Sequence, residues 1–218
     1  MGRREDNRRL RRARVLMAAR ALIEEGGIEG LSMRKLASGS GLAVNTIYGL
    51  FGGSREAILE ALIEDGIESM HAALDQQSFD DPLHFARSII TRGIEHFLAS
   101  EALYRAAFLA ELQSPQVRPW GMGVVLRRGG EAIQNLVGAG LLRDDVDLRL
   151  LAREIMSRFR ALAHHWARGT IDGSELRVRG LYSLHICLLA IATDLGRPRL
   201  LEGLRQAERE LQALAASG

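Results

Sequence analysis

The strongest constraint on the fold is that apolar residues recur at helical spacing along most of the chain, in segments separated by glycine or proline. Between Leu10 and Glu25 the apolar positions fall three or four residues apart, which places them on one face of a helix. Gly26-Gly27 ends this segment, because glycine adopts the left-handed geometry of a helix C-terminus at little cost. No segment alternates apolar and polar residues as a half-buried strand would, and no internal repeat stands out. The chain is therefore predicted to be all-α.

Polar caps and chain breakers predict the helices that follow. Ser32 and Ser54 stand where a side-chain oxygen would cap a helix, and Asp81 precedes Pro82, which suits a first helical position. The predicted helices are residues 33–39, 43–50, Ser54 to about Leu74, Pro82 to Leu98, Ser100 to Leu112, Trp120 to Val137, 147–168, 173–194, and a last one after Gly196-Arg-Pro198 to about Ala215.

Composition favours a protein of the cytoplasm. A hydrophobic fraction of 47% is ample for a buried core. The single cysteine, Cys187, rules out an internal disulfide and fits a reducing compartment. No apolar run approaches the ~20 residues that span a bilayer, and the N-terminus lacks the apolar stretch of a secretory signal. We therefore expect a soluble, cytoplasmic protein without a membrane partner.

Charge is distributed unevenly along the chain. Residues 1–58 hold eleven Arg or Lys against six Asp or Glu, whereas the remainder holds 18 against 21. Seven arginines fall within the first 14 residues. This asymmetry suggests that the N-terminal end meets a polyanion, although a disordered, solubilising arginine tail would have the same composition.

The two short helices at 33–39 and 43–50, joined by a glycine-containing turn, predict a helix-turn-helix unit. A recognition helix needs small or polar side chains at its start, and Ala43, Val44 and Asn45 supply them. Asn can make paired hydrogen bonds to adenine, and Ala or Val can contact a thymine methyl group. The predicted partner is thus double-stranded DNA.

Other polar residues nearby are suited to the DNA backbone. The hydroxyl groups of Thr46 and Tyr48 can reach phosphates, which orient the helix without reading sequence. Arg34 could reach phosphate or guanine, and Arg55 would add charge beside a helix N-terminus. By contrast, Ile47 and Leu50 are expected in the core.

Residues 13–62 read ARVLMAARALIEEGGIEGLSMRKLASGSGLAVNTIYGLFGGSREAILEAL, and this stretch resembles the TetR family of bacterial transcription regulators. The resemblance lies in the spaced motifs A-A-x-x-L-I-x-x-x-G, L-S-M-R-x-L-A and T-hydrophobic-Y-x-x-F. It implies a three-helix DNA-binding domain, here residues 1–56, and a helical ligand-binding and dimerisation domain, here 57–218. It also implies that the DNA contacts are Arg34, Val44, Asn45, Thr46, Tyr48 and Arg55.

The chain departs from the family pattern at the end of the recognition helix. Leu50 stands where a polar, phosphate-contacting residue is frequent, and Gly49 precedes it. The turn FGGSRE is one residue longer than the usual F-x-S-K-E, and Arg55 replaces the common lysine. Arginine keeps the charge but prefers planar, forked contacts.

The C-terminal region carries no motif that names a ligand. The resemblance implies a homodimer through the helices near 147–168 and 173–194, and LYSLHICLLAIA is too apolar for an exposed helix. Aromatic and sulfur side chains at helical spacing either belong to the ordinary core or line a small-molecule pocket. The pocket candidates are Phe97, Tyr104, Phe108, Trp120, Met156 and Phe159.

No metal, cofactor or catalytic site is predicted. Adjacent His164 and His165 point about 100° apart on a helix and do not share a ligand face. No nucleophile and base occur at catalytic spacing. The predicted function is a ligand-released dimeric repressor that binds operator DNA. The alternative is a helical small-molecule binding protein, or an enzyme, with a vestigial DNA-binding head.

Overall fold

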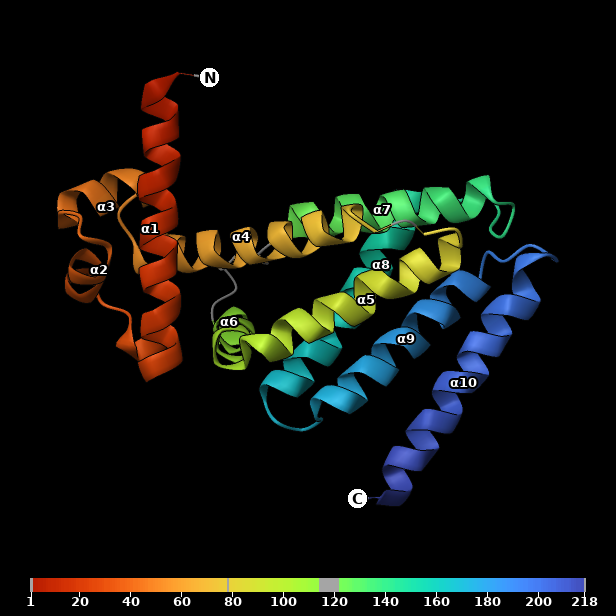
Figure 1. Ribbon diagram of the computed structural model, residues 1–218. Coiled ribbons are helices and arrows are strands. Elements are labelled where there is room, and N and C mark those ends of the chain that lie inside the picture. Colours follow the sequence, from red (N-terminus) through yellow and green to blue (C-terminus); the bar gives the residue numbers. More distant parts are fainter. Residues whose placement is uncertain (1, 78, 114–121, 218) are drawn as a thin grey trace. The chain divides into compact units, whose positions relative to one another are not determined.

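A computed structural model of the chain describes residues 2–77, 79–113 and 122–217. Within these ranges the regular structure is helical, apart from one isolated bridge between Leu142 and Ala192. The helices are α1 (Arg3–Gly26), η1 (Ile28–Gly30), α2 (Met33–Ser40), α3 (Val44–Phe51), α4 (Arg55–Asp75), α5 (Pro82–Ala99), α6 (Glu101–Gln113), α7 (Met122–Gly138), α8 (Leu148–Ala167), α9 (Gly173–Leu189) and α10 (Gly196–Ser217) (Figure 1). The all-α prediction is confirmed. None of the described helices is long and apolar enough to cross a membrane.

The chain forms two compact units. The first is Met1–Gly66 with Ser100–Gly121, and the second is Ile67–Ala99 with Met122–Gly218. Helix α4 therefore begins in the first unit and ends in the second, and the chain passes between the units again where α5 gives way to α6. The domain division between residues 56 and 57 that the sequence predicts stays a prediction.

The first unit is built around α1. Helix α2 packs on α1 and on α3, and α6 packs on α1 and η1. The core between these helices is mainly aliphatic and includes Val15, Leu16, Ala19, Ile23, Leu31, Leu36, Ile47 and Phe51. Burial of this face holds α2 and α3 together, since helices of eight residues are not stable alone.

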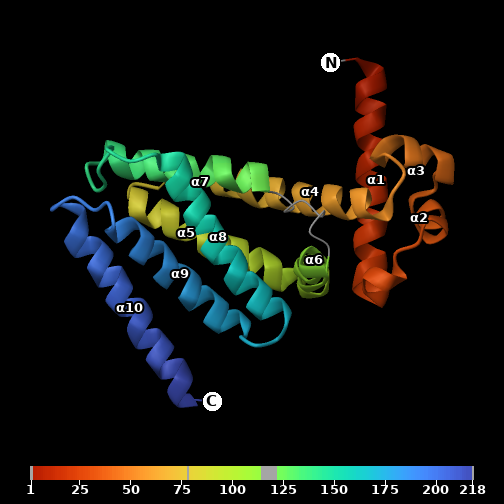
Figure 2. The same cartoon turned by 180° about the vertical axis from the view of Figure 1, so that it is seen from behind.

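The second unit is a helical bundle. Helix α5 packs on α7 and α9, α8 lies between α7 and α9, and α10 lies along α9 (Figures 1 and 2). At one end the ring of Phe97 lies 6.0 Å from that of Phe159 and 6.4 Å from that of Trp166, measured between centroids. Trp166 is fully buried, so this aromatic cluster is part of the core.

Three of the predicted caps form as expected. The Ser32 hydroxyl accepts a hydrogen bond from the Lys35 amide at 3.3 Å, and Ser54 accepts one from Ala57 at 3.0 Å. Asp81 accepts one from the Leu83 amide at 3.0 Å, directly before the α5 that Pro82 opens. These short-range hydrogen bonds fix the starts of α2, α4 and α5.

Two helix boundaries differ from the sequence prediction. The helix predicted at 173–194 ends at Leu189, because residues 191 and 193 exchange backbone hydrogen bonds with residues 141 and 143. The sequence predicts that Gly196-Arg-Pro198 separates two helices, but these residues form the first turn of α10, where proline needs no amide hydrogen.

Helix α1 also begins earlier than predicted. The apolar pattern starts at Leu10, whereas the helix starts at Arg3. Glu5 and Asp6 lie in its first turn, where carboxylates favour the positive end of the helix dipole. The arginine-rich N-terminus is thus helical.

Candidate functional site

The turn between α2 and α3 depends on Gly41. Its backbone is left-handed, with φ 64° and ψ 31°, a conformation that costs other L-residues free energy. The Arg14 guanidinium donates a 2.6 Å hydrogen bond to the Ser40 carbonyl oxygen. A Cβ atom at position 41 would lie 2.8 Å from that same guanidinium. The left-handed turn therefore favours glycine, and a larger residue would also displace the guanidinium that ties the turn to α1.

Helix α3 has one buried and one exposed side. Ile47 is fully buried and Phe51 is 6% exposed, so two residues four apart fasten the helix to its own domain. Ala43, Asn45 and Tyr48 are exposed on the rest of the surface. The expectation that Ile47 belongs to the core is confirmed, and Leu50 is half-buried.

The first turn of α3 presents both side chains and backbone. No side chain caps its start, whereas Ser32 caps α2. Ala43 and Asn45 are exposed here, whereas Val44 and Thr46 are half-buried. Small side chains let a partner approach closely, and the uncapped amide groups favour an anion. The turn therefore combines a hydrogen-bonding side chain with an open, electropositive helix end.

The longer turn after α3 is made by two glycines with positive φ. Gly52 has φ 73° and Gly53 has φ 91°, and both values lie in the region that favours glycine. The Tyr48 ring lies beside Gly53, with Cδ1 3.7 Å from the position of a Cβ atom there, and the residue remains 39% exposed. The longer turn FGGSRE thus packs against the Tyr48 ring.

Arg34 and Arg55 are both predicted to contact DNA, but their surroundings differ. Arg34 is exposed on α2, and within the described ranges it forms no ion pair. The Arg55 guanidinium donates a 2.5 Å hydrogen bond to the Ile28 carbonyl oxygen and lies 3.4 Å from the Glu29 carboxylate. Arg55 therefore joins the start of α4 to η1.

Two arginines of α1 contact the helix-turn-helix unit in ways that the sequence does not predict. Arg14 holds the turn through Ser40, and the Arg12 guanidinium lies over the Phe51 ring, 4.7 Å from its centroid. Such a cation–π contact is favourable by about 0.5–1 kcal/mol at an exposed site. Both partners are more than 25 residues away in sequence, so no local pattern could have predicted them.

The six pocket candidates do not share one environment. Phe97 and Phe159 belong to the aromatic cluster of the second unit, and Met156 lines a separate cavity there. Tyr104 and Phe108 lie on α6 in the first unit, and Trp120 lies outside the described residues. Burial raises the pKa of Tyr104 above its usual value, and the nearby Asp65 acts in the same direction.

The cavity at Met156 is small and apolar. Its volume is about 40 Å³, far below the roughly 300 Å³ or more of typical ligand pockets. It is lined by α5, α7, α8 and α9, and none of the described residues that line it is ionisable. The lining residues are Ala86, Ile89, Ile90, Val125, Gly129, Ala132, Ile133, Leu136, Ala152, Ile155, Met156, Leu184 and Leu188.

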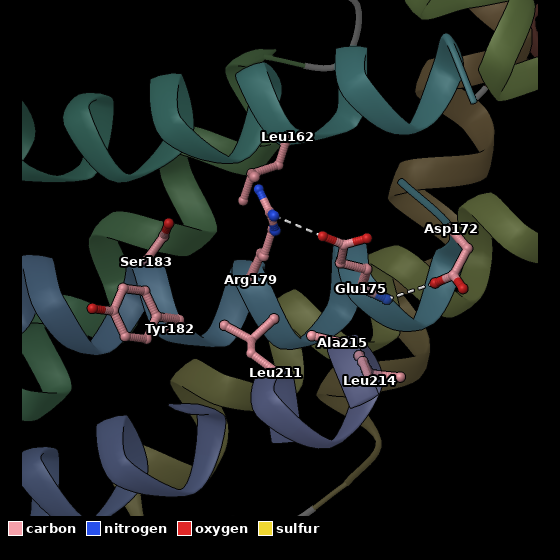
Figure 3. A pocket seen from close by; sticks show the side chains of 9 residues that line it. All are labelled: Leu162, Asp172, Glu175, Arg179, Tyr182, Ser183, Leu211, Leu214 and Ala215. Carbon is pink, nitrogen blue, oxygen red and sulfur yellow. Dashed lines mark hydrogen bonds and ion pairs between the residues drawn. The ribbon is translucent and has the colours of Figure 1, made fainter. Parts of the chain in front are cut away.

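A larger, open groove of about 560 Å³ runs over α9 between α8 and α10 (Figure 3). Its floor carries Glu175 and Arg179, which form an ion pair at 2.7 Å, beside Tyr182. Leu162 comes from α8, and Leu211 and Leu214 come from α10. Across the described ranges no three His, Cys, Asp or Glu side chains gather as a metal site.

Arg14 ties the turn to α1, Ile47 and Phe51 pack α3 against its own domain, and the first turn of α3 is exposed. These features define a helix-turn-helix DNA-binding head joined to a helical second unit. Residues 15–62 match the model of the bacterial regulatory proteins of the tetR family. This match confirms the resemblance of the head to the TetR family that its sequence motifs predicted.

Solved structures with the same fold share little sequence with this chain. RolR in complex with resorcinol is 21% identical over 94% of this chain and 96% of its own, with a TM-score of 0.68. SmeT, the repressor of the Stenotrophomonas maltophilia multidrug efflux pump SmeDEF, is 22% identical over 84% and 91%, with a TM-score of 0.61. A TetR regulator from Haloarcula marismortui is 14% identical over 84% and 98%, with a TM-score of 0.65. No curated protein sequence matches the chain.

Proposed function

We propose that this regulator is a dimeric repressor that binds operator DNA through α3 and releases it when a small molecule binds the second unit. The observation that carries the proposal is the division of α3 into a face fastened by Ile47 and Phe51 and an exposed first turn containing Asn45. A helix held in this way can enter the major groove with its N-terminal residues at the base edges.

In this proposal the residues of the head divide into two groups. Asn45 reads adenine, with Ala43 and Val44 close to the bases. Thr46, Tyr48 and Arg34 contact phosphates and fix the register on the duplex. Arg55 is also predicted from sequence to contact DNA, but its guanidinium is hydrogen-bonded to η1. In this proposal the backbone amide groups at the start of α4 contact the nearby phosphate instead.

The proposed dimer forms through α8 and α9, as predicted from sequence, with the second helix ending at Leu189. Ile186 is 40% exposed on α9, and Tyr182 and Cys187 beside it are half-buried. Burial of this apolar surface against a second copy is favourable. A twofold axis would set the two α3 helices about 34–36 Å apart, which is the spacing of successive major grooves.

The proposed effector is small and largely apolar, because the described residues that line the cavity between α5, α7, α8 and α9 are not ionisable, and the cavity would widen from about 40 Å³ to hold it. RolR, which shares the fold, has been solved with resorcinol, and SmeT is a repressor. Helix α5 lines the cavity and leads directly into α6, which packs on α1 of the head. An effector would act by preferring a form of the protein that binds DNA less well, since only differential affinity shifts an equilibrium.

Selection of duplexes from a random-sequence library with the full-length protein tests the proposal. We expect a palindromic site whose half-sites lie about one helical turn apart, and affinity that falls steeply with salt. Asn45→Ala should lower affinity by about 1–3 kcal/mol, with loss of preference at one base pair per half-site. Thr46→Ala with Tyr48→Phe should weaken all duplexes alike.

Failure to enrich any duplex at low salt would contradict the proposal. Turnover of a small molecule by a protein that binds no DNA would instead support the rival, a helical binding protein or enzyme with a vestigial head. Loss of binding in Asn45→Ala without a change in base preference would remove Asn45 from the reading residues and leave the rest of the proposal standing.

A further inference from the structure

Helix α1 continues well beyond the domain that the family model describes. The match begins at residue 15, whereas the helix begins at Arg3. In both views the first turns of α1 extend past the level at which α3 packs against it (Figures 1 and 2). At 1.5 Å per residue, the segment from Arg3 to Arg12 adds about 14 Å to the head.

This segment is strongly basic and unpaired. Residues 3–14 hold seven arginines against Glu5 and Asp6. The side chains from Arg3 to Arg11 are exposed, and among the residues that the structure describes these arginines form no ion pair. They therefore keep their full charge for a partner.

The arginines form a row on the side of α1 that faces α3. Arg4, Arg8 and Arg11 are spaced four and three apart, so they share one face of the helix, and Arg8 stands one turn before Arg12. Arg12 lies over the Phe51 ring at the end of α3, which fixes the direction of that face. The row therefore continues outward from the side of α1 on which the recognition helix packs.

The arrangement is unfavourable for the free helix. Like charges three and four residues apart repel one another, and cations near a helix N-terminus oppose its dipole. The segment buries no apolar side chain that would compensate, since Leu10 is 64% exposed. An anionic partner lying along this row would relieve both repulsions.

We propose that Arg4, Arg8 and Arg11 bind the phosphate backbone of duplex DNA outside the base pairs read by α3. This inference rests on the proposed function and extends it, because it makes α1 a rigid second contact that lengthens the binding site. The reach of about 14 Å corresponds to about four base pairs of flanking duplex on each side. The contact carries no base preference, since arginines here meet phosphates.

The test compares two duplexes built on the site selected by the wild-type protein. One is trimmed to the selected base pairs, and the other carries about six further base pairs of arbitrary sequence at each end. Binding is measured by fluorescence anisotropy over a series of salt concentrations. The variant replaces three arginines at once: Arg4→Gln, Arg8→Gln and Arg11→Gln.

We expect the triple variant to lose at least about tenfold in affinity for the extended duplex at 100 mM salt. The slope of log K against log salt should fall by about 2.7 per protomer, from three lost phosphate contacts. On the trimmed duplex the two proteins should bind alike. The corresponding triple lysine variant keeps the charge and should keep most of the slope.

Two controls separate this contact from general effects. Glutamine is as good a helix former as arginine, and circular dichroism should show unchanged helix content. A matched variant with three exposed arginines of the second unit replaced should bind both duplexes like the wild type: Arg127→Gln, Arg197→Gln and Arg205→Gln.

Equal loss on both duplexes, or no loss on either, would overturn the inference while the proposed function stood. A wild-type protein that selects no duplex would instead overturn the proposed function, and this inference with it. The length dependence is therefore the decisive measurement.

Discussion

Arg55 allows the predicted and the observed roles of one side chain to be separated by measurement. Its guanidinium donates to the Ile28 carbonyl oxygen and lies beside Glu29. A hydrogen bond from a charged donor contributes about 1.5–3 kcal/mol, and the lower end applies to a side chain that is one-third exposed. The Glu29 side chain is 92% exposed, so the ion pair adds about 0.3 kcal/mol or less.

We therefore expect Arg55→Met to destabilise the head by about 1.5 kcal/mol and Glu29→Ala to have almost no effect. For a domain of the size of the head, a loss of about 1.5 kcal/mol corresponds to a fall in Tm of about 8 °C. Hydrogen exchange followed by mass spectrometry reports the loss locally, as faster exchange in peptides from α1 to α4.

The same variants distinguish a tie within the head from a phosphate contact. If Arg55 is committed to Ile28, Arg55→Met leaves the salt slope of DNA binding unchanged, whereas loss of a phosphate contact lowers it by about 0.9 per protomer. Arg34→Met is the matched control, because Arg34 is exposed and unpaired in the described ranges. It should lower the slope without lowering stability. A fall in slope for Arg55→Met at unchanged stability would refute this reasoning.

Two further predictions concern the second unit. Gly129→Ala and Gly130→Ala should each stabilise the protein by about 0.5–1 kcal/mol, but only Gly129 lines the cavity. Xenon, an apolar single-atom probe, should therefore bind the wild type and Gly130→Ala but not Gly129→Ala in a xenon NMR titration; equal binding to all three would place the cavity elsewhere. Burial and then the charge of Arg87 lower the pKa of His185, whose Nδ1–H donates to the Leu181 carbonyl oxygen while its ring packs on Gly203. The unfolded chain thus binds a proton that the folded protein does not, so stability should fall as pH drops below about 6.5, and this fall should be smaller in His185→Asn. Urea-unfolding midpoints that shift equally in the two proteins between pH 7.5 and 5.5 would contradict it.

The parts of the fold that were predictable from sequence are those set by local chemistry. Caps such as Ser32 and Asp81 act within three residues, and apolar spacing places Ile47 inward without reference to distant segments. The family motifs predicted the helix-turn-helix unit for the same reason, because its turn and helix faces are short-range features.

The boundaries that were missed depend on distant residues or on charge. Helix α9 ends where residues 191 and 193 pair with residues 141 and 143, although the apolar pattern continues. The arginine-rich start of α1 has no apolar period to read, and its helix follows from continuity with the packed turns after it. The partner of Arg55 is a backbone carbonyl 27 residues away, which no side-chain pattern reports.

The glycines of α7 have a consequence for how the cavity can open. Gly123, Gly129 and Gly130 lie within a 17-residue helix, and together they lower its intrinsic stability by about 3 kcal/mol relative to alanine. In the part of the chain that the structure describes, no heavy atom outside the helix's own backbone lies within 4 Å of a Cβ position at any of the three, so close packing there does not require them. Helix α7 thus depends on its contacts with α5 and α8, and local unfolding should be least costly there. Of the four helices that line the cavity, α7 should therefore be the one that moves aside for a ligand at the lowest free energy.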